Sequence, residues 1–189
     1  MRMKNIALLW AGTAMLAPCG APLLAETPPQ PVGKKFQVYQ RRDAREQVNP
    51  ALIGIWKVDT AVSTKTPEGG QTIRLRTFQY TEDAKLLVGL INVYEDGSQL
   101  LANWAVHMDG TPGVEYRTDT AATPFAVISM HKISDLQYDF TTSEFGLVQH
   151  TGTYTLSEDG KTLTHTRKWS RGDWKVVYHK WNGLNDMSQ

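Results

Sequence analysis

Residues 147–170, LVQHTGTYTLSEDGKTLTHTRKWS, contain the pattern that decides the fold. Two runs rich in threonine, tyrosine, leucine and tryptophan, at 147–156 and 162–170, flank the pair Asp159-Gly160. Such residues favour half-buried strands, and glycine tolerates the positive φ that a tight hairpin turn requires. The stretch therefore predicts an antiparallel hairpin.

The second strand of this hairpin alternates in character. Leu163, His165, Arg167 and Trp169 share one face, opposite three threonines and Lys168. If that face lines a barrel, a guanidinium lies among apolar walls and needs a partner. The partner would be an internal carboxylate or the anionic head of an apolar ligand, which an arginine can hold through two hydrogen bonds. Two alternatives remain: the face points outward, or Arg167 only seals the barrel.

The same pattern of short runs continues along most of the chain. Alternation is clear at 98–107 and 135–142, and Asp-Gly or Gly-Asp pairs stand between several runs. No long helical pattern interrupts them, and closing such a sheet removes its edges. We therefore predict an all-β fold, an antiparallel up-and-down barrel of eight to ten strands over residues 50–182. The expected strands are 53–60, 71–81, 85–94, 98–107, 113–118, 124–132, 135–142, 147–156, 162–170 and 174–181.

One of these strands is apolar on both faces. Residues 86–93 read LLVGLINV, so the outer side of this strand should also be covered. The N-terminal segment or a second chain would supply that cover, and the second reading predicts a homodimer.

The N-terminus has the features of an export signal. Arg2 and Lys4 precede a short apolar stretch that is too short to span a bilayer, and small residues follow it. We predict a signal peptide over residues 1–25 with cleavage after Ala25, and a periplasmic or secreted protein that has no membrane span in its mature chain.

The cysteine in this segment does not suit lipid attachment. A lipoprotein site requires a small residue before the acylated cysteine, but Pro18 precedes Cys19. We therefore do not expect a lipoprotein. Cleavage after Ala25 would remove the chain's one cysteine together with two cations.

The flanks of the predicted barrel have a different composition. Residues 26–49 read as a proline-rich leader followed by a possible short helix, and residues 183–189 as a C-terminal tail. The leader would be a solvated extension, or a lid or contact for an anionic surface.

Three stretches together resemble a known superfamily. GIWK at 54–57 resembles the G-x-W signature of lipocalins and calycins. GTYTLSEDGKTLT at 152–164 looks like the penultimate hairpin of bacterial lipocalin-like proteins, and HMDG at 107–110 is similar to their central segment. The resemblance implies a barrel of eight to ten strands with a cavity, and it says more about fold than about role.

The same resemblance implies how one end of the barrel is closed. In calycins the tryptophan of the first strand closes one end and a late-strand cation lies across it. Trp56 matches the tryptophan, and Arg167, Arg171 and Lys180 are the candidates for the cation. A cation over an indole face contributes ~0.5–2 kcal/mol.

Composition and motifs exclude several classes of function. The 189 residues suit one domain, and 20 Lys+Arg against 19 Asp+Glu argue against nucleic acid as a partner. No G-x-S-x-G elbow and no phosphate-binding glycine loop occurs. No two histidines stand at the local spacing of metal ligands. The sequence therefore predicts no metal and no cofactor, and it leaves open whether the protein is an enzyme.

The leading hypothesis is a ligand-binding barrel. Trp104 and Tyr138 would build an apolar wall beside His165, Arg167 and Trp169, around a small apolar or amphipathic molecule. Two alternatives remain. In a barrel enzyme of isomerase, cyclase or hydrolase type, acid–base chemistry would fall to His165, Tyr138 and a third residue, Glu144. In a structural or interaction protein, side chains would fill the barrel.

Overall fold

Ten antiparallel strands close into one barrel in this computed structural model, which describes residues 42–64, 70–120, 124–170 and 172–183. Each strand pairs with its neighbours in sequence, and β1 pairs with β10 to complete the ring. The strands are β1 (Gly54–Val58), β2 (Gln71–Tyr80), β3 (Leu86–Tyr94), β4 (Gln99–Val106), β5 (Gly113–Arg117), β6 (Pro124–Lys132), β7 (Gln137–Glu144), β8 (Leu147–Leu156), β9 (Thr162–Trp169) and β10 (Trp174–Lys180). The predicted all-β antiparallel barrel is confirmed.

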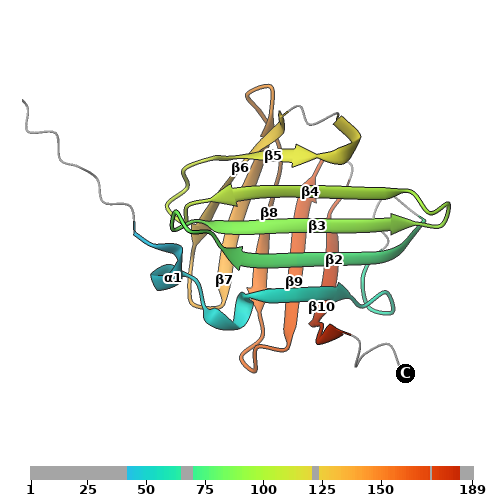
Figure 1. Cartoon of the computed structure of the whole chain (residues 1–189), viewed down its shortest axis with the longest axis horizontal. Coiled ribbons are helices and arrows are strands. Elements are labelled where there is room, and N and C mark those ends of the chain that lie inside the picture. The colour runs from blue at the N-terminus through green and yellow to red at the C-terminus, as the bar shows by residue number, and fades with distance from the viewer. Residues whose placement is uncertain (1–41, 65–69, 121–123, 171, 184–189) are drawn as a thin grey trace, which may run out of the picture. The chain divides into compact units, whose positions relative to one another are not determined.

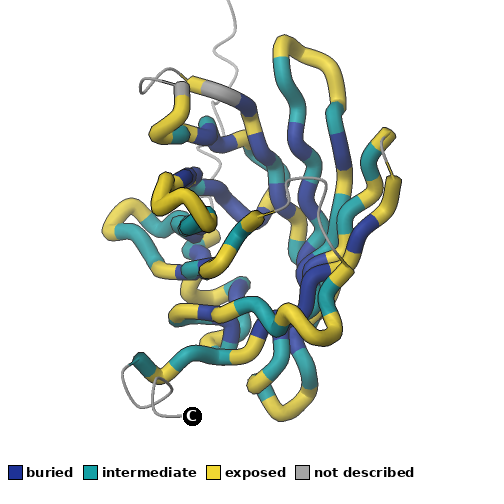
Figure 2. Tube along the Cα trace, turned by 90° about the vertical axis from the view of Figure 1, so that its right-hand side faces the viewer, coloured by how far each residue is buried: buried dark blue, intermediate teal, exposed yellow. Residues whose placement is uncertain are grey.

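The arrangement places two groups of strands across one interior. Figure 1 shows β2, β3, β4 and β5 side by side, with β7 to β10 crossing behind them. Buried and exposed residues alternate along the strands (Figure 2). This alternation follows from the pleat, which turns successive side chains to opposite faces of a sheet. Every second residue therefore faces the lumen wherever the strand pairing is regular, and register shifts in the pairs β2–β3, β5–β6 and β7–β8 interrupt this alternation locally.

The strand β7 differs most from its predicted range. It begins two residues later than expected because Ile133 N–H and Gln137 N–H donate to Gln137 O and Ser134 O in a turn. It continues to Glu144, where Phe145 and Gly146 form the hairpin with φ of 51° and 79°. The predicted break at 143–146 contains this hairpin, but a phenylalanine at positive φ carries no turn signal, so the sequence did not assign the turn to Phe145-Gly146.

A short N-terminal segment closes one end of the barrel. It comprises the one-turn helix α1 (Ala44–Gln47) and the 3-10 turn η1 (Pro50–Leu52). Leu52 is fully buried, and its carbonyl accepts a 2.8 Å hydrogen bond from Trp56 Nε1. The Asn49 N–H donates to the hydroxyl of Tyr138 at 2.8 Å, and that hydroxyl donates to the carbonyl of Asp135. The predicted short helix therefore belongs to the barrel's closed end.

The outer side of β3 remains partly exposed. Leu87, Ile91 and Val93 point outward and are half-buried, while Ile73 and Leu101 on the flanking strands are 44% and 40% exposed. The predicted cover by residues before 42 lies outside the described residues, so both that cover and a homodimer stay predictions.

The predicted signal peptide, the leader up to residue 41 and most of the C-terminal tail also lie outside the described residues. Within the described ranges, no helix has the length and apolar character that crossing a bilayer would require.

Candidate functional site

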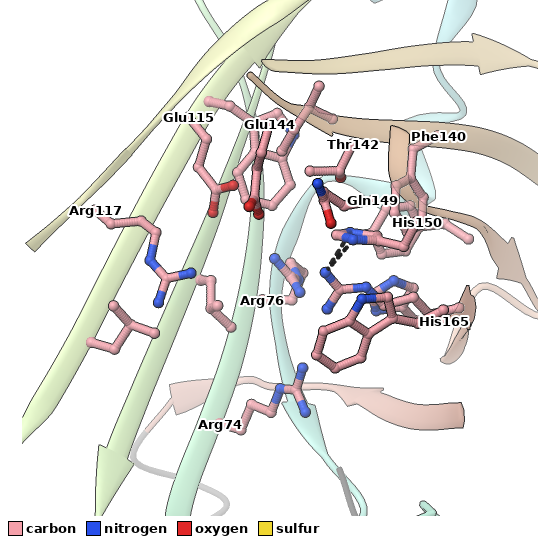
Figure 3. A pocket seen from close by; sticks show the side chains of 17 residues that line it. Arg74, Arg76, Glu115, Arg117, Phe140, Thr142, Glu144, Gln149, His150 and His165 are labelled. Atoms are coloured by element: carbon pink, nitrogen blue, oxygen red, sulfur yellow. Dashed lines mark hydrogen bonds between the residues drawn. The ribbon is translucent and has the colours of Figure 1, made fainter. Parts of the chain in front are cut away.

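A cavity of about 330 Å³ occupies the barrel beyond its closed end. This volume lies near the lower limit for small-molecule pockets, ~300–1,000 Å³. The lining side chains come from strands β2 to β9, and they combine aromatic rings with charged groups (Figure 3). They are Arg74, Arg76, Leu90, Leu100, Trp104, Glu115, Arg117, Ile128, Phe140, Thr142, Glu144, Gln149, His150, Tyr154, His165, Arg167 and Trp169.

The structure brings four of the predicted ligand-binding residues to this cavity. Trp104 from β4 and His165, Arg167 and Trp169 from β9 all line it. Tyr138 does not, because its inward position lies nearer the closed end, where its hydroxyl is already hydrogen-bonded. Phe140, two residues further along β7, takes the place in the cavity wall that we expected for Tyr138.

A glycine makes room for Phe140. Gly152 on β8 pairs directly with Phe140, and a Cβ at this position would lie 2.5 Å from the phenyl ring and 2.3 Å from the Thr166 carbonyl. Only glycine lets the ring lie across the strand here. The glycine of the 152–164 motif thus shapes the cavity wall.

Two arginines from β2 lie almost fully inside the cavity. Arg74 is 8% exposed and Arg76 is 4% exposed. The Arg74 guanidinium carbon lies 5.2 Å from the centre of the Trp174 ring, and that of Arg76 lies 5.3 Å from the ring of Trp104 and 5.9 Å from that of Tyr154. Aromatic faces attract cations, so the rings hold the guanidinium groups in place.

These guanidinium groups lack acceptors. No carboxylate of the described residues forms an ion pair with Arg74 or Arg76, and Arg74 Nε and both Nε and Nη1 of Arg76 are buried without a hydrogen bond. The Tyr178 hydroxyl lies near Arg76, but the geometry of a hydrogen bond is not met. The indole N–H of Trp104 has no acceptor either. The cavity is therefore rich in buried donors that have no acceptor among the described residues.

The third arginine contacts a histidine. Arg167 Nη2 lies 2.8 Å from His150 Nδ1, and its guanidinium carbon lies 5.7 Å and 5.3 Å from the rings of Trp169 and Trp174. Burial and the Arg167 charge together lower the pKa of His150 to about 3. His150 is therefore neutral near pH 7, and a ring nitrogen can accept a hydrogen bond from the Arg167 guanidinium, which donates its N–H.

His165 is packed between aromatic rings. It stacks on Tyr154 at 4.4 Å and meets the edge of Trp174 at 4.9 Å. Both ring nitrogens are buried without a hydrogen-bond partner. Burial, followed by the charges of Arg76 and Arg74, lowers the pKa of His165 well below its ordinary value. The positive charge of the cavity therefore comes from arginines, while both histidines stay neutral.

Two carboxyl groups also face the cavity. Glu115 on β5 is 9% exposed, and burial raises its pKa against the opposing effects of Arg117 and Arg76. Glu144 at the end of β7 lines the same cavity. Arg117 itself forms an ion pair with Asp119 at 2.7 Å.

Lys180 is the cation that covers Trp56, the tryptophan of the first strand, at the closed end. Lys180 Nζ lies 5.4 Å from the Trp56 ring centre and donates to the carbonyl of Ala51 at 2.8 Å. Arg167, which we also considered for barrel closure, lies in the cavity over Trp169 and Trp174 instead, and Arg171 lies outside the described residues. Strand register explains why Lys180 covers the ring, because Lys180 is paired directly with Trp56 across β1 and β10.

Sequence reasoning missed Arg74, Arg76 and Glu115. The available signal was alternation within 71–81, where both arginines share a face with Phe78. The opposite face carries Ile73, which is apolar too, so alternation did not show which side was inside.

Comparison with known proteins adds little beyond the fold. No protein-family model and no curated protein sequence matches the chain. Among solved structures, the crystal structure of the wild-type fluorescent protein UnaG is similar with a TM-score of 0.48 and 11% identity, over 68% of this chain and 96% of that one. A redesigned β-barrel, mFAP1 bound to DFHBI, is similar with a TM-score of 0.36 and 14% identity, over 71% of this chain and 99% of that one. The closed antiparallel barrel itself fits the lipocalin-like, calycin type of fold that the sequence predicts.

Proposed function

We propose that the protein binds a small amphipathic molecule inside the barrel, with an anionic group held by Arg74, Arg76 and Arg167. The observation that carries this proposal is the pair of buried arginines that face the cavity without a carboxylate partner in the described part of the chain. A buried charge is costly unless it is paired, so two buried guanidinium groups that have no carboxylate partner among the described residues are best explained by a partner from outside the chain.

The neighbouring side chains support the same proposal. Trp104, Phe140 and Trp169 offer apolar area, while the guanidinium groups offer several N–H donors. Ten of the seventeen lining side chains are polar or charged, so this cavity is more polar than the mostly apolar wall of a usual small-molecule site, which suits a ligand with a charged group better than a purely apolar one. A cavity of about 330 Å³ also argues against a barrel filled by its own side chains.

The enzyme hypothesis receives uneven support. His165 and Glu144 line the cavity, but the hydroxyl of Tyr138 is engaged at the closed end. Acid–base chemistry by these residues stays a prediction.

Octanoate is a suitable probe of ligand binding, because it combines one carboxylate with an apolar chain. Isothermal titration of the mature protein should show saturable binding, and Arg76→Met should weaken it at least tenfold through the loss of a charge-assisted contact. Arg42→Met removes an exposed cation outside the cavity and should leave the affinity unchanged. Equal affinities for octanoate in both variants would contradict the proposal, and native mass spectrometry of gently purified protein would show any ligand retained from the cell.

We further propose that the protein acts in the periplasm or outside the cell. The support is the N-terminal sequence, with its charged start, short apolar stretch and small residues before Ala25. Intact-mass analysis of the exported protein should give a chain that begins at Glu26. A full-length chain retained in the cytoplasm would contradict this proposal.

A further inference from the structure

Two sets of opposite charges face the same cavity without pairing. Arg74 and Arg76 project from β2, and Glu115 projects from β5. Glu115 is more than nine-tenths buried, and it forms no hydrogen bond or ion pair with any side chain in the described ranges. Neither set therefore neutralises the other by direct contact.

The two acidic side chains lie together in the cavity. Figure 3 shows Glu115 and Glu144 near Arg117 and Arg76, with Arg74 and His165 farther away. Burial raises the pKa of Glu115, the charges of Arg117, Arg76 and Arg167 oppose this rise, and the charge of Glu144 adds to it, so the carboxyl groups interact electrostatically with each other and with the guanidinium groups. Arg117 is turned toward Asp119, with which it makes two hydrogen bonds.

The topology explains why the two sets stay apart. Two strands, β3 and β4, separate β2 from β5 around the ring. The side chains are therefore anchored on different parts of the wall, and rings such as Trp104 hold the guanidinium groups back. Among the described residues, Arg74 and Arg76 thus keep donors and Glu115 keeps acceptors that no direct bond between them satisfies.

We propose that the ligand is bipolar, carrying an anionic group toward Arg74 and Arg76 and a protonated amine or hydroxyl toward Glu115 and Glu144. Its apolar middle would lie against rings such as Phe140. This inference rests on the proposed function, and it adds that the far end of the ligand is a hydrogen-bond donor. Such a molecule supplies acceptors where the cavity has donors and donors where it has acceptors, which satisfies both sets of buried groups at once.

A matched series of probes tests the second pole: octanoate, its ω-hydroxy derivative and its ω-amino derivative. These molecules share the carboxylate and the chain, and they differ only in the group at the far end. We expect calorimetry to give about tenfold tighter binding of the ω-amino acid than of octanoate, with the ω-hydroxy acid between them, because hydrogen bonds to charged groups are the stronger ones. Equal affinities, or a preference for plain octanoate, would overturn the inference.

Variants of the two glutamates then locate the effect. Glu115→Gln combined with Glu144→Gln should remove the preference for the ω-amino acid, while Glu158→Gln, an exposed carboxylate in the β8–β9 turn, should retain it. If the double variant instead strengthened binding of all three probes equally, the carboxylates would act only as background charge, and the second pole would be excluded.

The two proposals fail differently. Binding of octanoate that depends on Arg76 but shows no effect of the far end overturns the bipolar ligand and leaves the anion site intact. Absence of binding for all three probes at millimolar concentration overturns the anion site and, with it, the inference built on it.

Discussion

The closed end of the barrel and its cavity are built from the same strands but carry opposite chemistry. β2 places Phe78, fully buried, at the closed end and Arg76 in the cavity two residues earlier. β9 does the same with Leu163, fully buried at the closed end, and His165 followed by Arg167. The inward-facing residues of one strand thus pack the closed end and line the cavity, because position along a strand determines which part of the lumen a side chain enters.

The two regions also differ in how well their polar groups are satisfied. At the closed end Trp56, Tyr138 and Lys180 each have a hydrogen-bond partner. In the cavity Arg76 and His165 retain buried nitrogens that have none among the described residues. We infer that the closed end contributes most of the folding stability. The cavity contributes less, because its buried polar groups lack partners among the described residues, which is typical of binding sites.

The largest expected effect is a loss of packing at the closed end. Phe78→Ala should lower the free energy of unfolding by about 3–5 kcal/mol, because it leaves a cavity in a fully packed region. Urea denaturation measures this change. Phe145→Ala, which truncates the same residue type where it is fully exposed, should change stability by less than about 0.5 kcal/mol. Similar losses in the two variants would contradict the contrast between core and surface.

The next effect concerns pH and the cavity. The lowered pKa of His165 means that below about pH 6.5 the unfolded chain binds a proton that the folded chain excludes. Stability should therefore be greatest above that pH and fall on acidification by up to about 1.4 kcal/mol per pH unit for each excluded proton, and His150, whose pKa is also lowered, should add to the fall. Denaturation curves at several pH values should show a flatter dependence in His165→Gln than in His131→Gln, which alters an exposed histidine. An unchanged slope in His165→Gln would show that this histidine titrates normally.

A third effect should have the opposite sign. Arg76→Met replaces a buried charge that has no ion-pair partner among the described residues by an apolar chain of similar length. The ligand-free protein should therefore gain about 1–2 kcal/mol of stability while losing anion binding. Thermal unfolding without ligand measures the gain, with Arg42→Met as the neutral control. A loss of stability would indicate that Arg76 has a partner within the free protein.

The smallest effect is expected at the tryptophan of the closed end. Lys180→Met removes the cation over Trp56 and the hydrogen bond to the Ala51 carbonyl, which should cost about 1 kcal/mol. Ligand affinity should not change, since Lys180 does not line the cavity. A loss of affinity without a loss of stability would show that the two ends of the barrel are coupled.

The glycine of the first-strand signature has a structural explanation that the sequence only hinted at. Gly54 has a φ of 133°, which favours glycine, and a Cβ there would lie 3.3 Å from the Lys180 side chain. The pair Gly54 and Trp56 therefore accommodates Lys180 in two ways, through space for its stem and through a ring beneath its charge. A short motif could suggest this cation but could not choose among three candidates, because the choice depends on the register between β1 and β10.

The ligand site was only partly predictable for a similar reason. The face of β9 that carries His165 and Arg167 was readable, since it alternates with threonines. The face of β2 that carries Arg74 and Arg76 was not, since apolar residues also occupy its outer side. Tyr138 faces the lumen, as its place in the alternating pattern predicts, but it lies at the closed end and not in the cavity. The alternating pattern does not show how far along the barrel axis a side chain lies.

The strands, their antiparallel order and the closure of the barrel were predictable from the amino-acid sequence. Those features depend on local period, turn residues and the need to remove sheet edges, all of which can be read from neighbouring residues. The folded barrel was needed to show that Arg74, Arg76 and Arg167 line the same cavity as Glu115. It was also needed to show that Lys180 covers Trp56. These contacts join residues that are far apart in the chain. They depend on strand register and on how side chains pack in the lumen.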